Sequence, residues 1–195
     1  DEVAPLAERF SASGHRLFLV GGSVRDLVTT VVRPDAPPPG DVDLDATTTA
    51  RPKEIKQLLQ GWADAIWTQG ERFGTIGAMK RVDVNGVLVE RVFEITTHRA
   101  EAYRADSTVN AMAIEVTSPL PVLVDPFAGA ADLAARVLRT PLTPAESFSD
   151  DPLRMLRAAR FITRYDLVPE PELLGAVESM AERLSIVSAE RIRDE

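Results

Sequence analysis

The sequence predicts an α+β fold, with a small mixed β-sheet and helices over residues 1–140 and an all-helical region over residues 141–195. Short apolar or alternating runs, which are typical of strands, recur as far as Val124 and then stop. The pair Asn85-Gly86 lies between two alternating segments, which is a strong signal for a β-hairpin. After these strands, apolar residues recur at helical spacing. We therefore expect a domain boundary near residue 140.

The first elements form a strand, a tight turn and a helix. Residues 16–20 are a short apolar run that ends at Gly21-Gly22, which predicts a buried strand entering a turn. Ser23, with Asp26 three residues later, matches a capping box and predicts a helix that begins at Ser23. The glycines allow a ligand to approach the backbone closely, and a helix N-terminus offers N–H groups to an anion. Arg25 adds a guanidinium suited to phosphate oxygens, although an ordinary capped helix explains the pattern equally well.

Residues 41–45 alternate three aspartates with Val42 and Leu44, the period of a half-buried strand. Residues two apart on a strand share a face, with Cα atoms about 6.6 Å apart. Two carboxylates at this spacing can lean onto a pair of divalent cations about 3.5–4 Å apart, the arrangement used for in-line phosphoryl displacement. Taken alone, the pattern also fits a solvated acidic face on an acidic protein.

The next segment predicts a helix that begins near Pro52 and packs on a core. Its apolar residues follow i, i+3, i+4, i+7 spacing: Ile55, Leu58, Leu59 and Trp62. Strands are expected over residues 65–68, 75–80 and 87–97. In the last of these, Glu94 shares a face with Val92 and Thr96 while Phe93 and Ile95 share the other. Glu94 is therefore a candidate functional carboxylate, with a surface glutamate on an edge strand as the alternative.

The remaining segments predict two more short strands and then helices. Residues 111–116 alternate, residues 122–124 end in a turn, and residues 131–136 read as a short helix. Thr143 and Glu146 form a second capping box, and Ser188 is expected to cap a last helix. Asp151 and Pro152 are expected to begin a helix through residue 164, followed by another over residues 172–183. Four arginines fall on one side of the first of these: Arg154, Arg157, Arg160 and Arg164. Asp151 lies one turn before Arg154, a spacing that also fits an ordinary ion pair.

Composition limits the classes of function. The net charge is −8, which argues against a broad basic face that grips nucleic acid, so RNA contacts would come from a local patch or from other parts of the protein. The absence of cysteine excludes disulfides and thiolate chemistry and suits a reducing cytosol. No apolar run reaches membrane-spanning length, so we expect a cytoplasmic protein without a membrane partner. The chain begins at Asp1, and we read it as part of a longer protein.

Taken in order, several segments resemble the head domain of class II tRNA nucleotidyltransferases, the CCA-adding enzymes and their bacterial poly(A) polymerase relatives. The matching segments are residues 21–26 (GGSVRD), 41–43 (DVD), 93–97 (FEITT), 108–113 (TVNAMA), 124–129 (VDPFAG) and 150–161 (DDPLRMLRAARF). The resemblance extends from about Leu17 to Arg193. It implies a nucleotidyltransferase head followed by a helical neck that is truncated at its C-terminal end.

The resemblance also implies an activity: addition of C and A to tRNA 3′ ends from CTP and ATP, with release of pyrophosphate. Asp41 and Asp43 would hold Mg²⁺, and Glu94 would be the third carboxylate. The triphosphate would be cradled at a second set of residues: Gly21, Gly22 and Arg25, with Asn110 also in contact with the nucleotide.

In the family's nucleotide-reading motif, Asp151 and Arg154 would read the incoming base. A carboxylate accepts a hydrogen bond from an exocyclic amino group, and a guanidinium donates to a ring nitrogen or carbonyl. This pair matches the amino-bearing edges of C and A and mismatches U and G. Arg157 and Arg160 would support the site or the phosphates. The alternative is a plain amphipathic helix with exposed arginines.

Three departures from the family pattern bear on this interpretation. Roughly twenty residues of that pattern, including a flexible loop used in switching between bases, are absent before Thr108. Either the protein lacks this loop, which would put base switching in doubt, or the loop is missing from the sequence given; the closely matching flanks favour the second. Asp150 replaces a glutamate of the motif, and the chain ends without the regions that grip tRNA.

The same motifs are compatible with other functions. A poly(A) polymerase that uses ATP alone shares the same motifs, and the sequence does not indicate the oligomeric state. A nucleotide-binding regulatory module without catalysis would be expected to lack one of the metal carboxylates, and all three are present. A purely structural domain would bind no nucleotide.

Overall fold

The computed structural model describes residues 2–36, 43–69, 74–84, 86–98 and 105–195. The chain divides into two compact units. The first comprises Asp1–Asp26, Pro39–Ala100 and Ala113–Val124, and the second comprises Leu27–Pro38, Glu101–Met112 and Asp125–Glu195. The division into a head over residues 1–140 and a neck over residues 141–195 stays a prediction.

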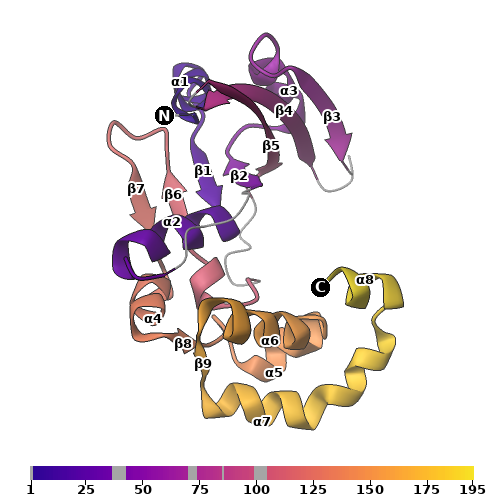
Figure 1. Cartoon of the computed structure of the whole chain (residues 1–195). Coiled ribbons are helices and arrows are strands. Elements are labelled where there is room, and N and C mark those ends of the chain that lie inside the picture. The colour runs from indigo at the N-terminus through magenta and orange to yellow at the C-terminus, as the bar shows by residue number, and fades with distance from the viewer. Residues whose placement is uncertain (1, 37–42, 70–73, 85, 99–104) are drawn as a thin grey trace. The chain divides into compact units, whose positions relative to one another are not determined.

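The first unit is built on a seven-stranded sheet with the order β3-β4-β5-β2-β1-β6-β7 (Figure 1). The strands are β1 (Leu17–Val20), β2 (Leu44–Thr48), β3 (Ala65–Gln69), β4 (Thr75–Val84), β5 (Val87–Thr97), β6 (Ala113–Glu115) and β7 (Val122–Val124). Neighbours β2 and β5 run parallel, and the other neighbouring pairs are antiparallel. The predicted mixed sheet is confirmed.

The hydrophobic core of this unit lies on one face of the sheet, where α1 (Ala4–Ala12) and α3 (Pro52–Leu59) contribute buried residues. Phe93 and Ile95 of β5 are buried in it, which confirms the predicted alternation and turns Glu94 to the opposite face. Trp62 packs edge-on against Phe93 with ring centroids 5.1 Å apart. The helix ends at Leu59, so Trp62 joins the core from the segment that follows.

Helix α2 (Gly22–Val32) begins one residue earlier than the sequence predicts, and the capping box assigned to Ser23 and Asp26 is wrong. The carbonyl of Gly21 accepts the bond from the Arg25 backbone N–H, and Gly21 has a φ of 70°, which a glycine adopts without strain. Ser23 therefore lies inside the first turn, where its hydroxyl donates to the Val20 carbonyl. The Asp26 carboxylate instead binds the Arg25 guanidinium.

The second unit is mainly helical (Figure 1). Its further elements are η2 (Thr108–Asn110), α4 (Gly129–Ala135), β8 (Val137–Leu138), α5 (Pro144–Asp150), α6 (Arg154–Tyr165), β9 (Val168–Pro169), α7 (Pro171–Met180), η3 (Ala181–Ile186) and α8 (Ala189–Asp194). The capping box of Thr143 and Glu146 is confirmed, as is the Ser188 cap on α8. Strand β9 departs from the all-helical expectation, because Asp166 ends α6 in the left-handed conformation and the chain then pairs with β8.

A buried carboxylate holds the η2 turn against α4. Asp132 is only 5% exposed and accepts from the Thr108 hydroxyl at 2.6 Å and from Arg139 Nε at 2.8 Å. Gly129 approaches so closely that a Cβ placed on it would lie 2.3 Å from the Thr108 carbonyl oxygen. These contacts fix the turn that carries Asn110.

None of the helices that the structure describes is both long and apolar enough to cross a lipid bilayer.

Candidate functional site

Two acidic residues of the first unit, Asp45 and Glu94, lie on the face of the sheet opposite the core. Asp45 on β2 and Glu94 on β5 are register partners in the parallel ladder. Neighbouring strands lie about 4.7–4.9 Å apart, so the two carboxylates stem from adjacent backbone positions. Asp43 comes directly before β2 and is exposed. Asp41 lies outside the described residues.

The charges of this cluster oppose one another. Asp45 is open to solvent at one side, but protein atoms crowd around its carboxylate. This partial burial, together with the nearby charges of Glu94 and then Asp43, raises the pKa of Asp45 from 3.8 to about 6. A cation bound among these groups would relieve the repulsion.

The donor atoms suit a hard divalent cation. Within the described residues, no three His, Cys, Asp or Glu side chains are gathered closely enough to cage a metal ion by themselves. Mg²⁺ is commonly held by one or two carboxylates together with substrate phosphates and water. Asp45 and its register partner Glu94 therefore suit a magnesium site that a bound triphosphate would complete.

The row of residues across the sheet continues from Glu94 to Gly77 on β4 and then to Trp67 on β3. A Cβ placed on Gly77 would lie 2.3 Å from two atoms of the Trp67 ring, so the indole lies directly over this glycine. Trp67 is 36% exposed. The carboxylate pair thus has an aromatic ring in the same row, and the missing side chain at Gly77 makes room for it.

The glycine turn before α2 lies beside the same carboxylates. A Cβ on Gly21 would lie 3.7 Å from the Asp45 carboxylate, so this backbone approaches the acidic cluster. A Cβ on Gly22 would lie 3.3 Å from Arg25 Nη2, which places the guanidinium over Gly22. Arg25 is 7% exposed, and its Nη2 lies 2.7 Å from Asp26 Oδ1. The predicted phosphate contacts are thus gathered at one turn, with the Arg25 charge partly balanced by Asp26.

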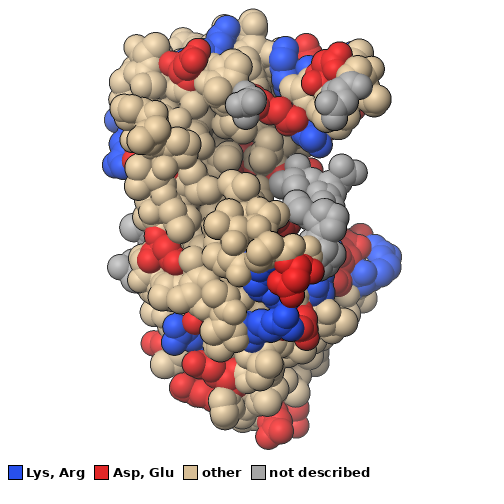
Figure 2. Space-filling model, turned by 60° about the vertical axis from the view of Figure 1, so that its left-hand side comes forward, with Lys and Arg blue, Asp and Glu red and all other residues tan. Residues whose placement is uncertain are grey.

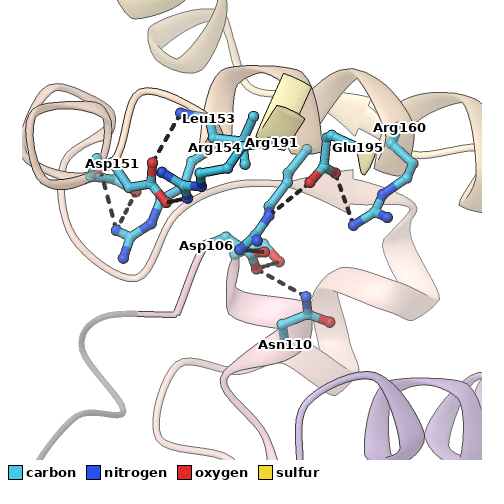
Figure 3. A network of polar contacts seen from close by, with 11 residues as sticks. Asp106, Asn110, Asp151, Leu153, Arg154, Arg160, Arg191 and Glu195 are labelled. Atoms are coloured by element: carbon cyan, nitrogen blue, oxygen red, sulfur yellow. Dashed lines mark hydrogen bonds and ion pairs between the residues drawn. The ribbon is translucent and has the colours of Figure 1, made fainter. Parts of the chain in front are cut away.

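In the second unit, the two predicted base-reading residues have well-defined partners (Figure 3). Asp151 Oδ2 accepts from Arg191 Nη2 at 2.8 Å, and Asp151 Oδ1 accepts from the Leu153 backbone N–H at 3.2 Å. Arg154 Nη1 donates to the Ser147 hydroxyl at 3.1 Å. Burial raises the pKa of Asp151, but the hydrogen bonds from Arg191 and Leu153 outweigh it and leave that pKa below its usual value.

The other predicted nucleotide-binding residues of this unit form a connected network. Arg157 Nε donates to Glu195 at 3.0 Å, and its Nη1 lies 3.6 Å from Asp106 Oδ2. Arg160 Nη2 lies 2.9 Å from the same Glu195 carboxylate. Asn110 Nδ2 donates to Asp106 at 2.9 Å (Figure 3). Arg157 and Arg160 therefore hold protein carboxylates, and Asp106 links Asn110 to Arg157.

Sequence reasoning missed four residues of these two clusters: Asp45, Asp106, Arg191 and Glu195. Asp45 could have been found, because it continues the alternation of Asp41 and Asp43 on one strand face. The spacing of Arg191 and Glu195, one helical turn apart, was a weaker signal. For Asp106 the only signal was its place four residues before Asn110.

Acidic and basic side chains are interspersed on the face shown in Figure 2. This mixture agrees with the net charge of −8 and gives the described part of that face no broad basic surface for nucleic acid.

Comparison with known proteins identifies the family. The sequence model described as the poly A polymerase head domain matches residues 17–139. This chain belongs to the poly A polymerase head domain family. The matched residues include Asp43, Asp45, Glu94 and Asn110, and the resemblance noted from the sequence is confirmed.

Relatives within the family extend the similarity over nearly the whole chain. The CCA-adding enzyme of Lactobacillus johnsonii is 31% identical over 212 aligned positions, covering 98% of this chain and 48% of that protein. The CCA-adding enzyme of Enterococcus faecalis is 30% identical and is covered to 47%. The chain thus spans about half the length of the curated relatives it matches. Because the alignments are longer than the 195 residues of the chain, they include positions that this chain lacks.

Solved structures of the family agree with the fold. A CCA-adding enzyme in complex with CTP superposes with a TM-score of 0.80 at 26% identity, covering 98% of this chain and 44% of the other. The Thermotoga maritima CCA-adding enzyme complexed with tRNA gives a TM-score of 0.79 at 28% identity, with the same coverage. The predicted nucleotidyltransferase head fold is therefore confirmed.

Proposed function

We propose that this chain carries the nucleotidyl-transfer part of a CCA-adding tRNA nucleotidyltransferase. It would add C and A to tRNA 3′ ends from CTP and ATP and release pyrophosphate. The observation that supports this most directly is the pairing of Asp45 with Glu94, beside Asp43, on the open face of the sheet. Its relatives over 97–98% of the chain are named CCA-adding enzymes.

We assign the Mg²⁺ ligands to Asp43 and Asp45, with Glu94 as the third carboxylate. The pair predicted from the sequence, Asp41 and Asp43, stays a competing assignment. When bound, Mg²⁺ would supply Lewis-acid stabilisation of the α-phosphate and lower the pKa of the RNA 3′-hydroxyl. With a pKa of about 6, Asp45 is mainly ionised above neutral pH and can act as a ligand. Gly21, beside Asp45, leaves space for the triphosphate to reach the backbone.

We assign base selection to Asp151 and Arg154. The ionised Asp151 carboxylate only accepts hydrogen bonds, so it suits the exocyclic amino groups of C and A. Arg154 supplies donors for the ring nitrogen or carbonyl beside that amino group. For Arg157, Arg160 and Asn110 we propose an indirect role, in which they hold α6, here called the reading helix, through Glu195 and Asp106.

The first test is calorimetric titration of this chain with CTP, ATP, UTP and GTP, each with Mg²⁺, repeated for Arg154→Ala. We expect CTP and ATP to bind more tightly than UTP and GTP, and the variant to lose this preference. Equal binding of all four nucleotides would leave only a general triphosphate site and would contradict base selection by the protein.

The metal assignment is tested by extension of tRNA that lacks its terminal nucleotides. The single variants Asp43→Asn and Asp45→Asn should lose more than about 100-fold in rate, since a metal contact is worth several kcal/mol in the transition state. Glu90→Gln, which changes an exposed carboxylate of β5 that pairs with Arg81, is the control and should stay near wild type. An inactive Asp41→Asn with an active Asp45→Asn would restore the pair predicted from the sequence. Because the chain spans about half of its relatives, we expect weak tRNA turnover from it alone.

A poly(A) polymerase that uses ATP alone is the second candidate, because the matching family is named after that activity. The same titration separates the two functions. Tight binding of ATP without binding of CTP would favour poly(A) addition.

A further inference from the structure

Helix α8, with Glu195 directly after it, presents two opposite charges to α6 and to the turn that precedes α6. Arg191 and Glu195 lie four residues apart, one helical turn, and therefore point to the same side. Arg191 binds Asp151, and Glu195 binds Arg157 and Arg160 (Figure 3). Arg191 thus meets Asp151 before the start of α6, and Glu195 meets Arg157 and Arg160 within α6.

We propose that Arg191 is a positioning residue for base selection, which holds Asp151 as an ionised carboxylate that only accepts hydrogen bonds. In that form Asp151 accepts from the amino groups of C and A and offers nothing to the carbonyl groups of U and G at the same place. This inference rests on the proposed function, because it assigns Asp151 to the incoming base.

The geometry leaves Asp151 able to bind a base while it is held. One oxygen accepts from Arg191 and the other from the Leu153 backbone N–H. Each carboxylate oxygen has two acceptor positions, so with respect to the described residues one on each oxygen remains for a ligand. The two bonds also restrict the rotation of the carboxylate, which fixes where the remaining acceptor positions point.

The charge state of Asp151 depends on its cationic neighbours. The side chain is about one quarter exposed, and its burial favours the neutral form. The charged groups that face it are Arg191 from α8, which has the larger effect, and Arg157 from α6. A protonated Asp151 would carry an O–H donor and could bond to the carbonyl of U or G. Removing the Arg191 charge should therefore turn base selection into a pH-dependent property.

We expect the fold to tolerate replacement of Arg191. Its side chain is half exposed, and exposed ion pairs contribute little to stability. Ser188 caps α8 through the Arg191 backbone N–H, and Glu195 keeps its own two partners, so the helix retains these contacts when the side chain changes.

The experiment compares wild type, Arg191→Gln and Arg191→Lys by titration with CTP, ATP, UTP and GTP plus Mg²⁺. Each titration is made at about pH 8, where an aspartate is ionised, and at about pH 4.5, close to the ordinary aspartate pKa of about 3.9. Arg193→Gln is the matched control, because Arg193 lies on the same helix and pairs only with the adjacent Asp194 among the described residues. The control should bind all four nucleotides as wild type does.

We expect wild type to prefer CTP and ATP at both pH values. Arg191→Gln should keep this preference at about pH 8 and lose about threefold of it at about pH 4.5, where part of the Asp151 population is protonated. Arg191→Lys should restore most of the preference at the lower pH. A merely structural role would weaken all four nucleotides alike at both pH values.

Two results would overturn the inference and leave the proposed function intact. One is that Arg191→Gln keeps the wild-type preference at both pH values. The other is that it loses affinity for all four nucleotides equally at both pH values. A wild type without any preference would overturn the proposed function, and this inference with it.

Discussion

Replacing Asp45 with asparagine should stabilise the chain above about pH 6 when no divalent cation is present. The native state holds a proton on Asp45 more tightly than the unfolded chain does, because its pKa is raised from 3.8 to about 6. The corresponding contribution to stability is complete below about pH 4 and is lost as the pH rises through about 6. Above that pH the ionised group is a net cost to folding, and asparagine removes it.

The size of the effect follows from the shift of about two pKa units. In a site without water this shift corresponds to about 3 kcal/mol. Asp45 is exposed at one side, so solvent screens its repulsion from Glu94 and Asp43. We therefore expect a gain of about 1 to 1.5 kcal/mol in the free energy of unfolding.

The assay is urea unfolding of wild type and Asp45→Asn at about pH 4 and about pH 8, with a chelator or with Mg²⁺. Without metal, the variant should be more stable at the higher pH and nearly equal at the lower. Mg²⁺ should stabilise wild type more than the variant. Glu90→Gln, which changes an exposed carboxylate on β5, is the control and should shift stability by less than about 0.5 kcal/mol. The reasoning is refuted if Asp45→Asn is no more stable than wild type at about pH 8 without metal.

Three further predictions concern stability and charge. Gly129→Ala should lower the free energy of unfolding by about 1–3 kcal/mol, because the added Cβ would meet the Thr108 carbonyl. Gly175→Ala has open space within α7 and should raise it by about 0.5–1 kcal/mol. Similar thermal midpoints for the two variants would contradict this. Asp132→Ala should cost about 3 kcal/mol in urea unfolding, because it leaves Thr108 and Arg139 without their buried acceptor, and a loss below about 1 kcal/mol would show that water replaces it. Arg16→Gln should raise the pKa of Glu115, which the Arg16 hydrogen bond holds below its usual value; an unchanged carboxyl titration by NMR would count against that pairing.

The sequence correctly predicted features that depend on interactions between residues close in sequence. The alternation in residues 92–96 placed Phe93 and Ile95 in the core and Glu94 on the other face, because strand geometry allows no other arrangement. The capping box at Thr143 formed as predicted, since both of its hydrogen bonds join residues three apart. The box at Ser23 failed because Gly21 adopts the positive φ that lets the helix begin one residue sooner.

Contacts between distant segments could not be predicted in the same way. The pairing of Asp45 with Glu94 depends on the register of two parallel strands 49 residues apart, which neither strand encodes alone. Arg191 reaches Asp151 across 40 residues, because the path of the chain through α7 and η3 returns α8 to the reading helix. The sequence showed an acidic strand and an arginine-rich helix, but the residues that contact them are brought there by tertiary structure.

Trp67, whose indole lies over Gly77, can serve as an intrinsic fluorescence reporter of binding at the carboxylates. The protein has two tryptophans, and Trp62 is buried in the core against Phe93. Trp67 is partly exposed and lies in the same cross-strand row as Glu94 and Asp45. Indole emission responds to nearby charge, so in a Trp62→Phe background the fluorescence of Trp67 should report the arrival of a cation or a triphosphate at the carboxylates. Binding at the sheet could then be followed in real time, separately from binding at the reading helix and without any attached dye.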